Sequence, residues 1–375
     1  MSGTPRSSAK EDERFMAAAL NLARRGLGRT APNPAVGALI VKEGAVIGRG
    51  ATGEGGRPHA ETLAIREAGA AAAGATLYVT LEPCSHHGKT PPCADAIVAV
   101  GIARVVSTIE DPDPRVAGSG FQRLRDAGIA VATGVLAEAA LRANLGHVLR
   151  VRRRRPMVTL KLAETADLYA AGPAGAPRLM ITGAPANARV HILRAMYDAV
   201  MIGAGTAIAD DPMLNVRLPG VEDRKPLRVV LDSHLDLPMH ARLVTSAREY
   251  PTLVIAGEGA STEAGARLLE ANVEIERVAW DSAGHADLAA ALAVLGARGI
   301  TRVLCEGGPS LAAALVARNL ADEILLLRSD KPLGAAGKPA LDASSRAALA
   351  DTSRYRLAEN GRLGEDSYLR YERVL

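Results

Sequence analysis

The sequence predicts two successive α/β domains. Its 375 residues exceed the roughly 250–300 residues at which a single hydrophobic core usually stops growing. Helical and strand-like stretches alternate along the chain, and between two such regions lies a basic segment, 150–155, that holds five arginines and precedes Pro156. Such a segment is typical of a linker. We therefore expect a disordered tail at 1–10, a first domain at 11–149, a linker at 150–156 and a second domain at 157–375.

The first domain alternates between helical and strand patterns. Helices are expected at 15–24, 59–73, 94–100 and 121–127, and strands at 75–81 and 105–109. A hairpin is expected at 36–46, with its turn near Glu43 and Gly44. This alternation predicts a three-layer α/β domain.

The second domain carries short apolar runs at 157–163, 199–202, 227–231, 252–256, 302–305 and 323–327. Runs of this length between helical stretches favour buried strands of a largely parallel sheet. No G-x-G-x-x-G follows any of them, so the ordinary dinucleotide-binding fingerprint is missing. Two glycine-containing segments, 203–206 and 307–310, each follow a strand. Their backbone amides would either cradle phosphate at the start of the next helix or simply form a turn.

The first domain also carries a metal-binding pattern. The triplet HAE at 59–61 is followed by PC at 83–84 and by Cys93. The pattern H-x-E…P-C-x-x-C is typical of zinc-dependent nucleobase deaminases, although here eight residues separate the cysteines instead of two. One histidine and two thiolates would bind zinc and leave its fourth position for water, as in catalytic sites. Glu61 would carry a proton from that water to the leaving ammonia.

A closed structural zinc site is the alternative interpretation. His86 or His87 would then supply a fourth ligand. A closed site gives no reason for a glutamate two residues after the histidine, so the pattern favours the catalytic interpretation.

Composition argues against several other classes of protein. Hydrophobic residues make up 48% and charged residues 23%, as in ordinary globular chains. A net charge of +4 is too small to indicate nucleic-acid binding, and no uncharged apolar run is long enough to span a membrane. The first ten residues lack the apolar core of a signal peptide. Three cysteines, one of them Cys305 in an apolar run, fit a reducing cytoplasm, where we expect the protein to act.

Several longer motifs resemble the bifunctional deaminase–reductase family of bacterial riboflavin biosynthesis. In the first domain these are PNPAVG at 32–37, HAE at 59–61, LEPCSHHGKTPPC at 81–93, DPDP at 111–114 and VAGSG at 116–120. In the second they are TAIADDPML at 206–214, VLDS at 230–233 and EGGPSL at 306–311. The resemblance implies a cytidine-deaminase-like domain followed by a dihydrofolate-reductase-like domain.

The resemblance also implies the chemistry of each domain. The first would remove the 2-amino group of a diaminopyrimidinone that carries ribosylamino 5-phosphate. His59, Cys84 and Cys93 would bind zinc, and Glu61 would shuttle protons. Asn33 and Lys89 would contact the substrate, the lysine at its phosphate. Phosphorylated pyrimidines would thus be the partners, and the family suggests at least a homodimer.

In the second domain the resemblance implies reduction of the ribosyl group to ribityl by NADPH. The residues implied at the cofactor site are Ala163, Thr206, Asp210, Ser233, Gly308, Pro309, Ser310, Leu311, Ala312, Ala313 and Ala314. Those implied to face the substrate are Arg194, Leu214, Arg217 and Glu306, and the arginines suit its phosphate. Lys161 and Asp210 are the candidate proton donors.

Two segments depart from the family pattern. The usual S-L-D-G-R/K is TADLY at 165–169, and the usual S-x-W-I-T is RLMIT at 178–182. Met180 would then pack on the nicotinamide or ribose in place of tryptophan, and Arg178 would hold a phosphate in place of a serine contact.

Three hypotheses follow from these observations. The first is the bifunctional enzyme, and the second is a nucleic-acid deaminase whose arginine segment grips a backbone. The long loop between the cysteines and an aromatic content of 3% argue against the second, because single-strand binding usually relies on aromatic stacking. The third keeps the deaminase but makes the second domain a non-catalytic module, as the changes at Arg178 and Met180 would allow. We adopt the first.

Overall fold

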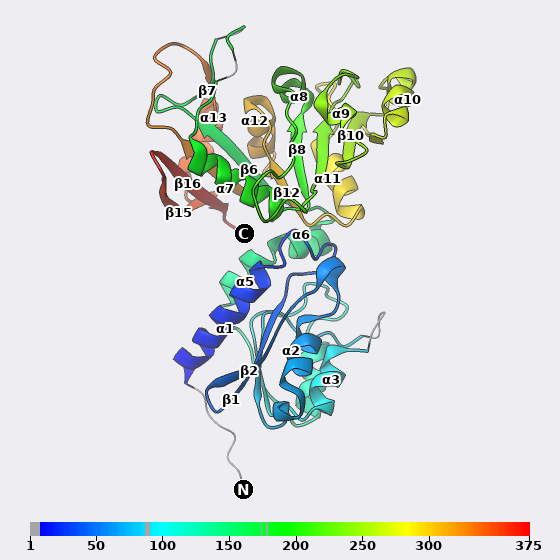
Figure 1. The fold of residues 1–375 in the computed structure, drawn as a ribbon, viewed down its shortest axis with the longest axis vertical. Coiled ribbons are helices and arrows are strands. Elements are labelled where there is room, and N and C mark those ends of the chain that lie inside the picture. The colour runs from blue at the N-terminus through cyan, green and yellow to red at the C-terminus, as the bar shows by residue number, and fades with distance from the viewer. Residues whose placement is uncertain (1–7, 87–90, 174, 178) are drawn as a thin grey trace. The chain divides into compact units, whose positions relative to one another are not determined.

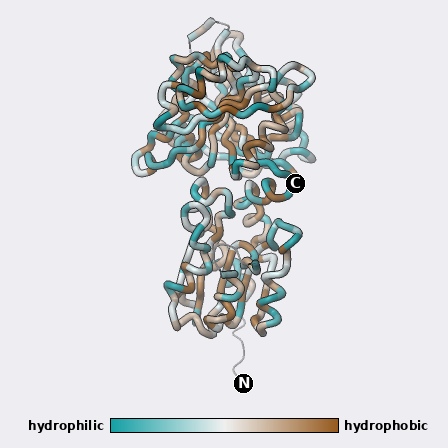
Figure 2. Tube along the Cα trace, turned by 90° about the vertical axis from the view of Figure 1, so that its right-hand side faces the viewer, coloured by the Kyte–Doolittle hydropathy of each residue, from teal (hydrophilic) through white to brown (hydrophobic). Residues whose placement is uncertain are grey.

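The computed structural model describes residues 8–86, 91–173, 175–177 and 179–375 (Figure 1). The chain divides into two units, Met1–Arg154 and Arg155–Leu375, and each has its own sheet. Figure 2 shows that hydrophobic residues gather along the central strands of each sheet.

The first unit is built on a five-stranded sheet of order β2-β1-β3-β4-β5. Strand β1 is antiparallel to β2 and to β3, whereas β3, β4 and β5 are parallel. The strands are β1 (Gly37–Lys42), β2 (Ala45–Ala51), β3 (Thr76–Val79), β4 (Arg104–Ser107) and β5 (Ala130–Ala132). The predicted hairpin is present, and Glu43 and Gly44 form its turn with φ of 52° and 77°, as a two-residue hairpin turn requires.

Helices cover both faces of this sheet, which confirms the three-layer prediction. They are α1 (Ala9–Arg24), α2 (Ala60–Ala68), α3 (Cys93–Ala99), α4 (Ser119–Asp126), α5 (Ala137–Ala143) and α6 (Leu145–Arg153), with short 3-10 turns at Glu54–Gly56 and Gly69–Ala72. Ala38 and Ile40 of β1 pack with α2, α3 and α4, while Leu39 and Val41 pack with α1 and α5. This split follows from the alternation of side chains along a strand.

Helix α2 lies unusually close to strand β2, and glycine makes this approach possible. A Cβ atom at Gly50 would lie 2.1 Å from the carbonyl oxygen of Ala60. Because α2 begins there, this close packing fixes the position of its first turn against the sheet.

Two boundaries expected from the sequence need correction. Residues 8–10 do not belong to a disordered tail, because Ser8 caps helix α1 by accepting a hydrogen bond from the backbone N–H of Glu11. The basic segment is not an irregular linker throughout. Residues 150–153 form the end of α6, where cationic side chains suit the negative end of the helix dipole. Arg155 instead pairs with Asp322 at 2.6 Å.

The second unit is built on a nine-stranded sheet of order β11-β10-β9-β8-β12-β6-β13-β16-β15. The strands from β11 to β13 are parallel, and β16 and β15 complete the sheet as an antiparallel pair. They are β6 (Met157–Glu164), β8 (Ala199–Gly203), β9 (Leu227–Leu231), β10 (Thr252–Gly257), β11 (Glu274–Val278), β12 (Arg302–Cys305), β13 (Glu323–Arg328), β15 (Tyr355–Leu363) and β16 (Asp366–Arg373). All six predicted strands are present. A separate two-stranded sheet pairs β7 (Tyr169–Ala171) with β14 (Lys338–Pro339).

Helices again cover both faces of the sheet. They are α7 (Ala184–Ala195), α8 (Ala204–Asp210), α9 (Arg242–Thr245), α10 (Thr262–Glu270), α11 (Leu288–Ala297), α12 (Pro309–Ala317) and α13 (Ala343–Ala350). Leucines of α11 and α12 pack with Leu160 and Val303 on one face. Residues of α7 pack with Leu304 and Leu325 on the other. Because seven neighbouring strands of this sheet are parallel, their carboxyl ends lie at one edge of the sheet. Helix α8 follows β8 and helix α12 follows β12 at that edge.

Candidate functional sites

Three potential zinc ligands meet in the first unit. His59 is the residue that precedes α2, Cys84 lies in the loop after β3, and Cys93 is the first residue of α3. Their ligand atoms all lie within 4.8 Å of one another. The Nδ1 atom of His59 is 3.3 Å from the Cys93 sulfur and 3.6 Å from the Cys84 sulfur. Tetrahedral zinc ligands with bonds of about 2.0 and 2.3 Å lie roughly 3.5 Å apart, so the group fits zinc.

Electrostatics favours a thiolate at Cys84. The Cys93 thiol shares a hydrogen bond with it, and His59 and the backbone N–H of Cys93 add further hydrogen bonds. Together these hydrogen bonds lower the pKa of Cys84 to about 4. The same bond between the sulfurs raises the pKa of Cys93, because one proton is held between them. A thiolate is the form that binds metal.

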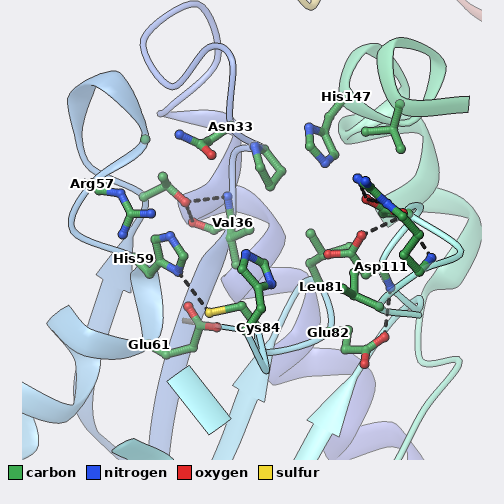
Figure 3. A pocket seen from close by; sticks show the side chains of 18 residues that line it. Asn33, Val36, Arg57, His59, Glu61, Leu81, Glu82, Cys84, Asp111 and His147 are labelled. Carbon is green, nitrogen blue, oxygen red and sulfur yellow. Dashed lines mark hydrogen bonds and ion pairs between the residues drawn. The ribbon is translucent and has the colours of Figure 1, made fainter. Parts of the chain in front are cut away.

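Glu61 lies beside this group in the first turn of α2. Figure 3 shows its carboxylate next to Cys84 and His59 at the base of the pocket. Its side chain is buried, and burial raises the pKa of Glu61, because a low-dielectric environment disfavours the charged form. A carboxyl group of raised pKa is suited to accept and then return a proton.

A cavity of about 490 Å³ opens above the predicted ligands. Asn33, which we predicted as a substrate contact, lines it, and so do Arg57 and His86. Lys89, the other predicted contact, lies outside the described residues. Cavities of this size commonly hold small molecules.

The opposite wall of the cavity contains residues that the sequence did not single out as contacts. Asp111 lies across the cavity from Glu61, and one of its oxygens accepts a hydrogen bond from the Asp113 backbone at 2.8 Å. Burial raises the pKa of Asp111. His147 of α6 also lines the wall, and burial lowers its pKa to about 4, so its imidazole is neutral at pH 7. The DPDP motif was a signal for Asp111, whereas nothing in the local sequence marks His147.

Glu82 holds the loop that carries Asp111. Its carboxylate accepts hydrogen bonds from the backbone N–H groups of Asp111 at 2.9 Å, Gly118 at 2.8 Å and Gly120 at 2.7 Å. A Cβ atom at Gly120 would lie 2.0 Å from the carbonyl oxygen of Pro83, so the loop packs directly on the segment that leads to Cys84. One buried carboxylate thus ties both walls of the cavity together.

We expect Glu82→Gln to weaken both the fold and the site of the first unit. The amide nitrogen of glutamine cannot accept hydrogen bonds, and each buried N–H left without a partner costs about 1–3 kcal/mol. Thermal unfolding and the KM for deamination would measure the effect. Glu13→Gln, on the exposed side of α1, is the matched control. An unchanged melting temperature and KM would show that the loop does not depend on Glu82.

A second cavity, of about 530 Å³, lies in the second unit where β6, β8 and β12 end. Seven predicted cofactor residues line it: Ala163, Thr206, Asp210, Gly308, Pro309, Ser310 and Leu311. Lys161 and Glu306 line it too. Gly308 donates its backbone N–H to the Thr206 hydroxyl at 3.0 Å, which joins the two glycine-containing segments. The start of α12 beside this cavity is suited to a phosphate, so the site fits a nucleotide cofactor.

Other predicted residues are not part of this cavity lining. Met180 is 72% exposed, and Ala312 is buried in the core. The hydroxyl of Ser233 accepts a hydrogen bond from the backbone N–H of Ala286. Ala313, Ala314 and Leu214 also lie outside the lining, and Arg178 lies outside the described residues.

The two arginines predicted to face the substrate, Arg194 and Arg217, belong to a cluster of polar residues next to Glu306. Arg194 pairs with Glu306 through two hydrogen bonds of 2.6 and 3.0 Å. Arg217 donates its backbone N–H to Nδ1 of His191 at 3.2 Å, and its guanidinium donates to the side chain of Asn215. The structure therefore brings Arg194 and Glu306 into direct contact, with Arg217 nearby through Asn215, whose carbonyl accepts from Arg194.

Comparison with known families agrees with both halves of the fold. Residues 9–109 match the cytidine and deoxycytidylate deaminase zinc-binding region, and residues 156–367 match the RibD C-terminal domain. The chain is thus a zinc-dependent deaminase joined to an NADPH-dependent reductase.

Relatives along the full length define the family. The riboflavin biosynthesis protein RibD of Escherichia coli (strain K12) is 38% identical over 379 residues, covering 95% of this chain and 98% of the relative. RibD of Aquifex aeolicus (strain VF5) is 39% identical over 86% of this chain and 88% of its own length. The chain belongs to the RibD family, the bifunctional enzymes of riboflavin biosynthesis.

Solved structures support the same conclusion. A structure of Acinetobacter baumannii RibD matches with a TM-score of 0.85 and 36% identity, covering 98% of this chain and all (100%) of that one. A Thermotoga maritima protein, described as a diaminohydroxyphosphoribosylaminopyrimidine deaminase and 5-amino-6-(5-phosphoribosylamino)uracil reductase, matches with a TM-score of 0.82 and 33% identity. The match covers 98% of this chain and 99% of that protein's chain.

Among the described residues, no helix is long and apolar enough to cross a membrane. The family assignment confirms the bifunctional hypothesis, with its predicted fold and cofactors.

Proposed function

We propose that the first unit hydrolyses the 2-amino group of 2,5-diamino-6-(5-phosphoribosylamino)pyrimidin-4-one. His59, Cys84 and Cys93 are the zinc ligands, and Glu61 is the proton carrier. The observation that carries this proposal is the meeting of three ligand atoms within 4.8 Å beside a buried glutamate at the base of a cavity. Bound zinc would supply an activated water at neutral pH.

Glu61 has two tasks in this proposal. It accepts a proton from the attacking water and delivers it to the leaving ammonia, and a buried carboxyl group exchanges that proton without loss to solvent. Asn33 and Asp111 face the pyrimidine from two walls of the cavity. An amide can pair with a carbonyl oxygen, and a carboxylate can accept from ring and amino N–H groups. Lys89 is proposed at the phosphate from the sequence alone.

We propose that the second unit reduces the deaminated product, 5-amino-6-(5-phosphoribosylamino)uracil, to its ribityl form. NADPH would supply the hydride. Thr206, Asp210 and the segment 307–311 hold the cofactor in this proposal, supported by their place around one cavity and by the start of α12. Ala163 lines the same cavity. We propose Met180, Ser233 and residues 312–314 as cofactor contacts from the sequence alone. Arg178 and Leu214 are likewise proposed from the sequence alone, as substrate contacts.

Proton delivery and phosphate binding complete this proposal. Lys161 and Asp210 both line the cavity, and they are the candidate donors of the proton that reduction of the sugar requires. Arg217 is exposed and is the proposed ligand of the substrate phosphate.

We also propose that the enzyme acts in the cytoplasm as a homodimer or larger homo-oligomer. The three cysteines, Cys84, Cys93 and Cys305, are not joined in disulfides, which suits a reducing compartment. Light scattering on the purified protein would test the oligomeric state.

The reductase half is tested by following NADPH consumption. Purified protein is supplied with 5-amino-6-(5-phosphoribosylamino)uracil, and we expect NADPH to be oxidised in proportion to enzyme concentration. This result is expected despite Arg178 and Met180, because neither replaces an acid or a base. If NADPH is not consumed while deamination proceeds, the second unit is not a reductase for this substrate.

A further inference from the structure

His147 reaches the deaminase cavity from α6, a helix in which the sequence predicted no site residue. It lies in the first turn of α6 and is half-buried. Figure 3 shows it entering the cavity across from Glu61, with Asn33 to one side. The helix that ends in the basic residues 150–153 thus forms part of the cavity wall at its other end.

The imidazole of His147 is tied to the segment that carries Asn33. It forms a hydrogen bond with the backbone carbonyl of Pro32, and a carbonyl can only accept, so a ring N–H donates. Among the described residues, Nδ1 of His147 is buried and has no hydrogen-bond partner, which leaves Nε2 as the donor. Burial and the nearby charge of Arg150 lower the pKa of His147 to about 4, so the ring is uncharged at pH 7 and its one proton lies on the nitrogen that faces Pro32.

The other contacts of Asn33 are with backbone groups. Its backbone N–H donates to the carbonyl of Thr30 at 2.9 Å, and its Nδ2 donates to the carbonyl of Gly55 at 3.4 Å. A Cβ atom at Gly56 would lie 1.9 Å from that Nδ2, so the amide packs directly on the backbone there. Because 3.4 Å is long for a hydrogen bond, the tie from α6 to the residue before Asn33 adds to the constraint on this side chain.

We propose that His147 is a positioning residue of the deaminase, which holds the Pro32 carbonyl and thereby keeps the Asn33 amide turned toward the pyrimidine ring of the substrate. This inference rests on the proposed deaminase function of the first unit, with Asn33 as a substrate contact. A neutral N–H donor suits this task, because it binds a carbonyl without placing a further charge in the cavity.

Kinetics of deamination in the full-length protein test this role, with ammonia release from 2,5-diamino-6-(5-phosphoribosylamino)pyrimidin-4-one as the measurement. His147→Phe keeps a ring but removes the donor, and we expect kcat/KM to fall about three- to tenfold, the range of one net hydrogen bond. Most of the change should be in KM, because Asn33 is proposed to bind the ring in the ground state and the transition state alike. His147→Gln, whose amide N–H can replace that of Nε2, should recover most of the loss.

A double-variant cycle shows whether His147 acts through Asn33. If it does, adding His147→Phe to Asn33→Ala should lower kcat/KM by less than about twofold beyond Asn33→Ala alone. Where Asn33→Ala is too slow to measure, the comparison of glutamine with phenylalanine at position 147 decides the question. His147→Leu is a second variant without a donor, for the case in which His147→Phe fails to fold. His240→Phe is the matched control, because His240 is exposed in the second unit, and it should leave kcat and KM for deamination unchanged.

Three results would overturn the inference. The first is a lower melting temperature with unchanged kcat and KM, which would make the bond to Pro32 purely structural. The second is a His147→Gln protein as impaired as His147→Phe, which would show that no donor is needed. The third is an equal loss from His147→Phe with and without Asn33, which would give His147 a role of its own. Failure of the unmodified protein to release ammonia from this substrate would instead contradict the deaminase proposal itself.

Discussion

Replacing Glu61 with glutamine is expected to lower the rate of deamination by about 10²–10⁴-fold. The loss should lie toward the upper end of this range, because the same carboxylate is proposed to accept a proton from water and to return it to ammonia. Glutamine has nearly the same shape but cannot carry a proton. Ammonia release from the diaminopyrimidinone substrate is the measurement.

Two further readouts make this variant informative. Glu61 is not among the residues that could hold the metal, so zinc content measured by metal analysis should be unchanged. NADPH oxidation with the deaminated intermediate should also be unchanged, because that cavity lies in the other unit. Glu67→Gln is a matched control on the same helix, where Glu67 pairs with Arg49 outside the cavity. Loss of zinc together with the rate, or loss of both activities, would contradict the two-site proposal.

The first unit's ligand group could be predicted from sequence because its members belong to one short pattern. His59 immediately precedes one helix, Cys84 follows a strand, and Cys93 is the first residue of the next helix. Such positions meet at one edge of the sheet. Asp111 and His147 complete the cavity from loops and helices that converge only in three dimensions. Local patterns carry no information on that convergence.

In the second unit, too, some strands could be predicted from the sequence and others could not. The six predicted strands are central and apolar on both faces, so continuous hydrophobic runs mark them. Strands β11, β15 and β16 of the nine-stranded sheet were missed because most of their residues are exposed or half-exposed, which removes the hydrophobic signal. The pair of Arg194 and Glu306 joins residues far apart in the chain, and the sequence indicated each of them only by family resemblance.

Removing a zinc ligand should abolish deamination and leave reduction intact, as Glu61→Gln should, but in this case zinc should be lost as well. We expect Cys84→Ala to abolish both zinc binding and deamination, because two remaining ligands cannot hold a tetrahedral catalytic site. The substitution removes Cys84, whose thiolate form is favoured by the neighbouring hydrogen bonds. Metal analysis and ammonia release measure the two effects, and NADPH oxidation should continue when the deaminated intermediate is supplied.

Chelation and a second cysteine variant complete this experiment. Removal of zinc from the unmodified protein should stop deamination but not reduction, and added zinc should restore it. Cys305→Ala is the control, because Cys305 is a free cysteine buried in β12 of the other unit and is not among the potential ligands. It should keep both zinc and deamination. Deamination by a zinc-free Cys84→Ala protein would mean that Glu61 and the cavity act without the metal, and would exclude His59, Cys84 and Cys93 as the catalytic zinc site.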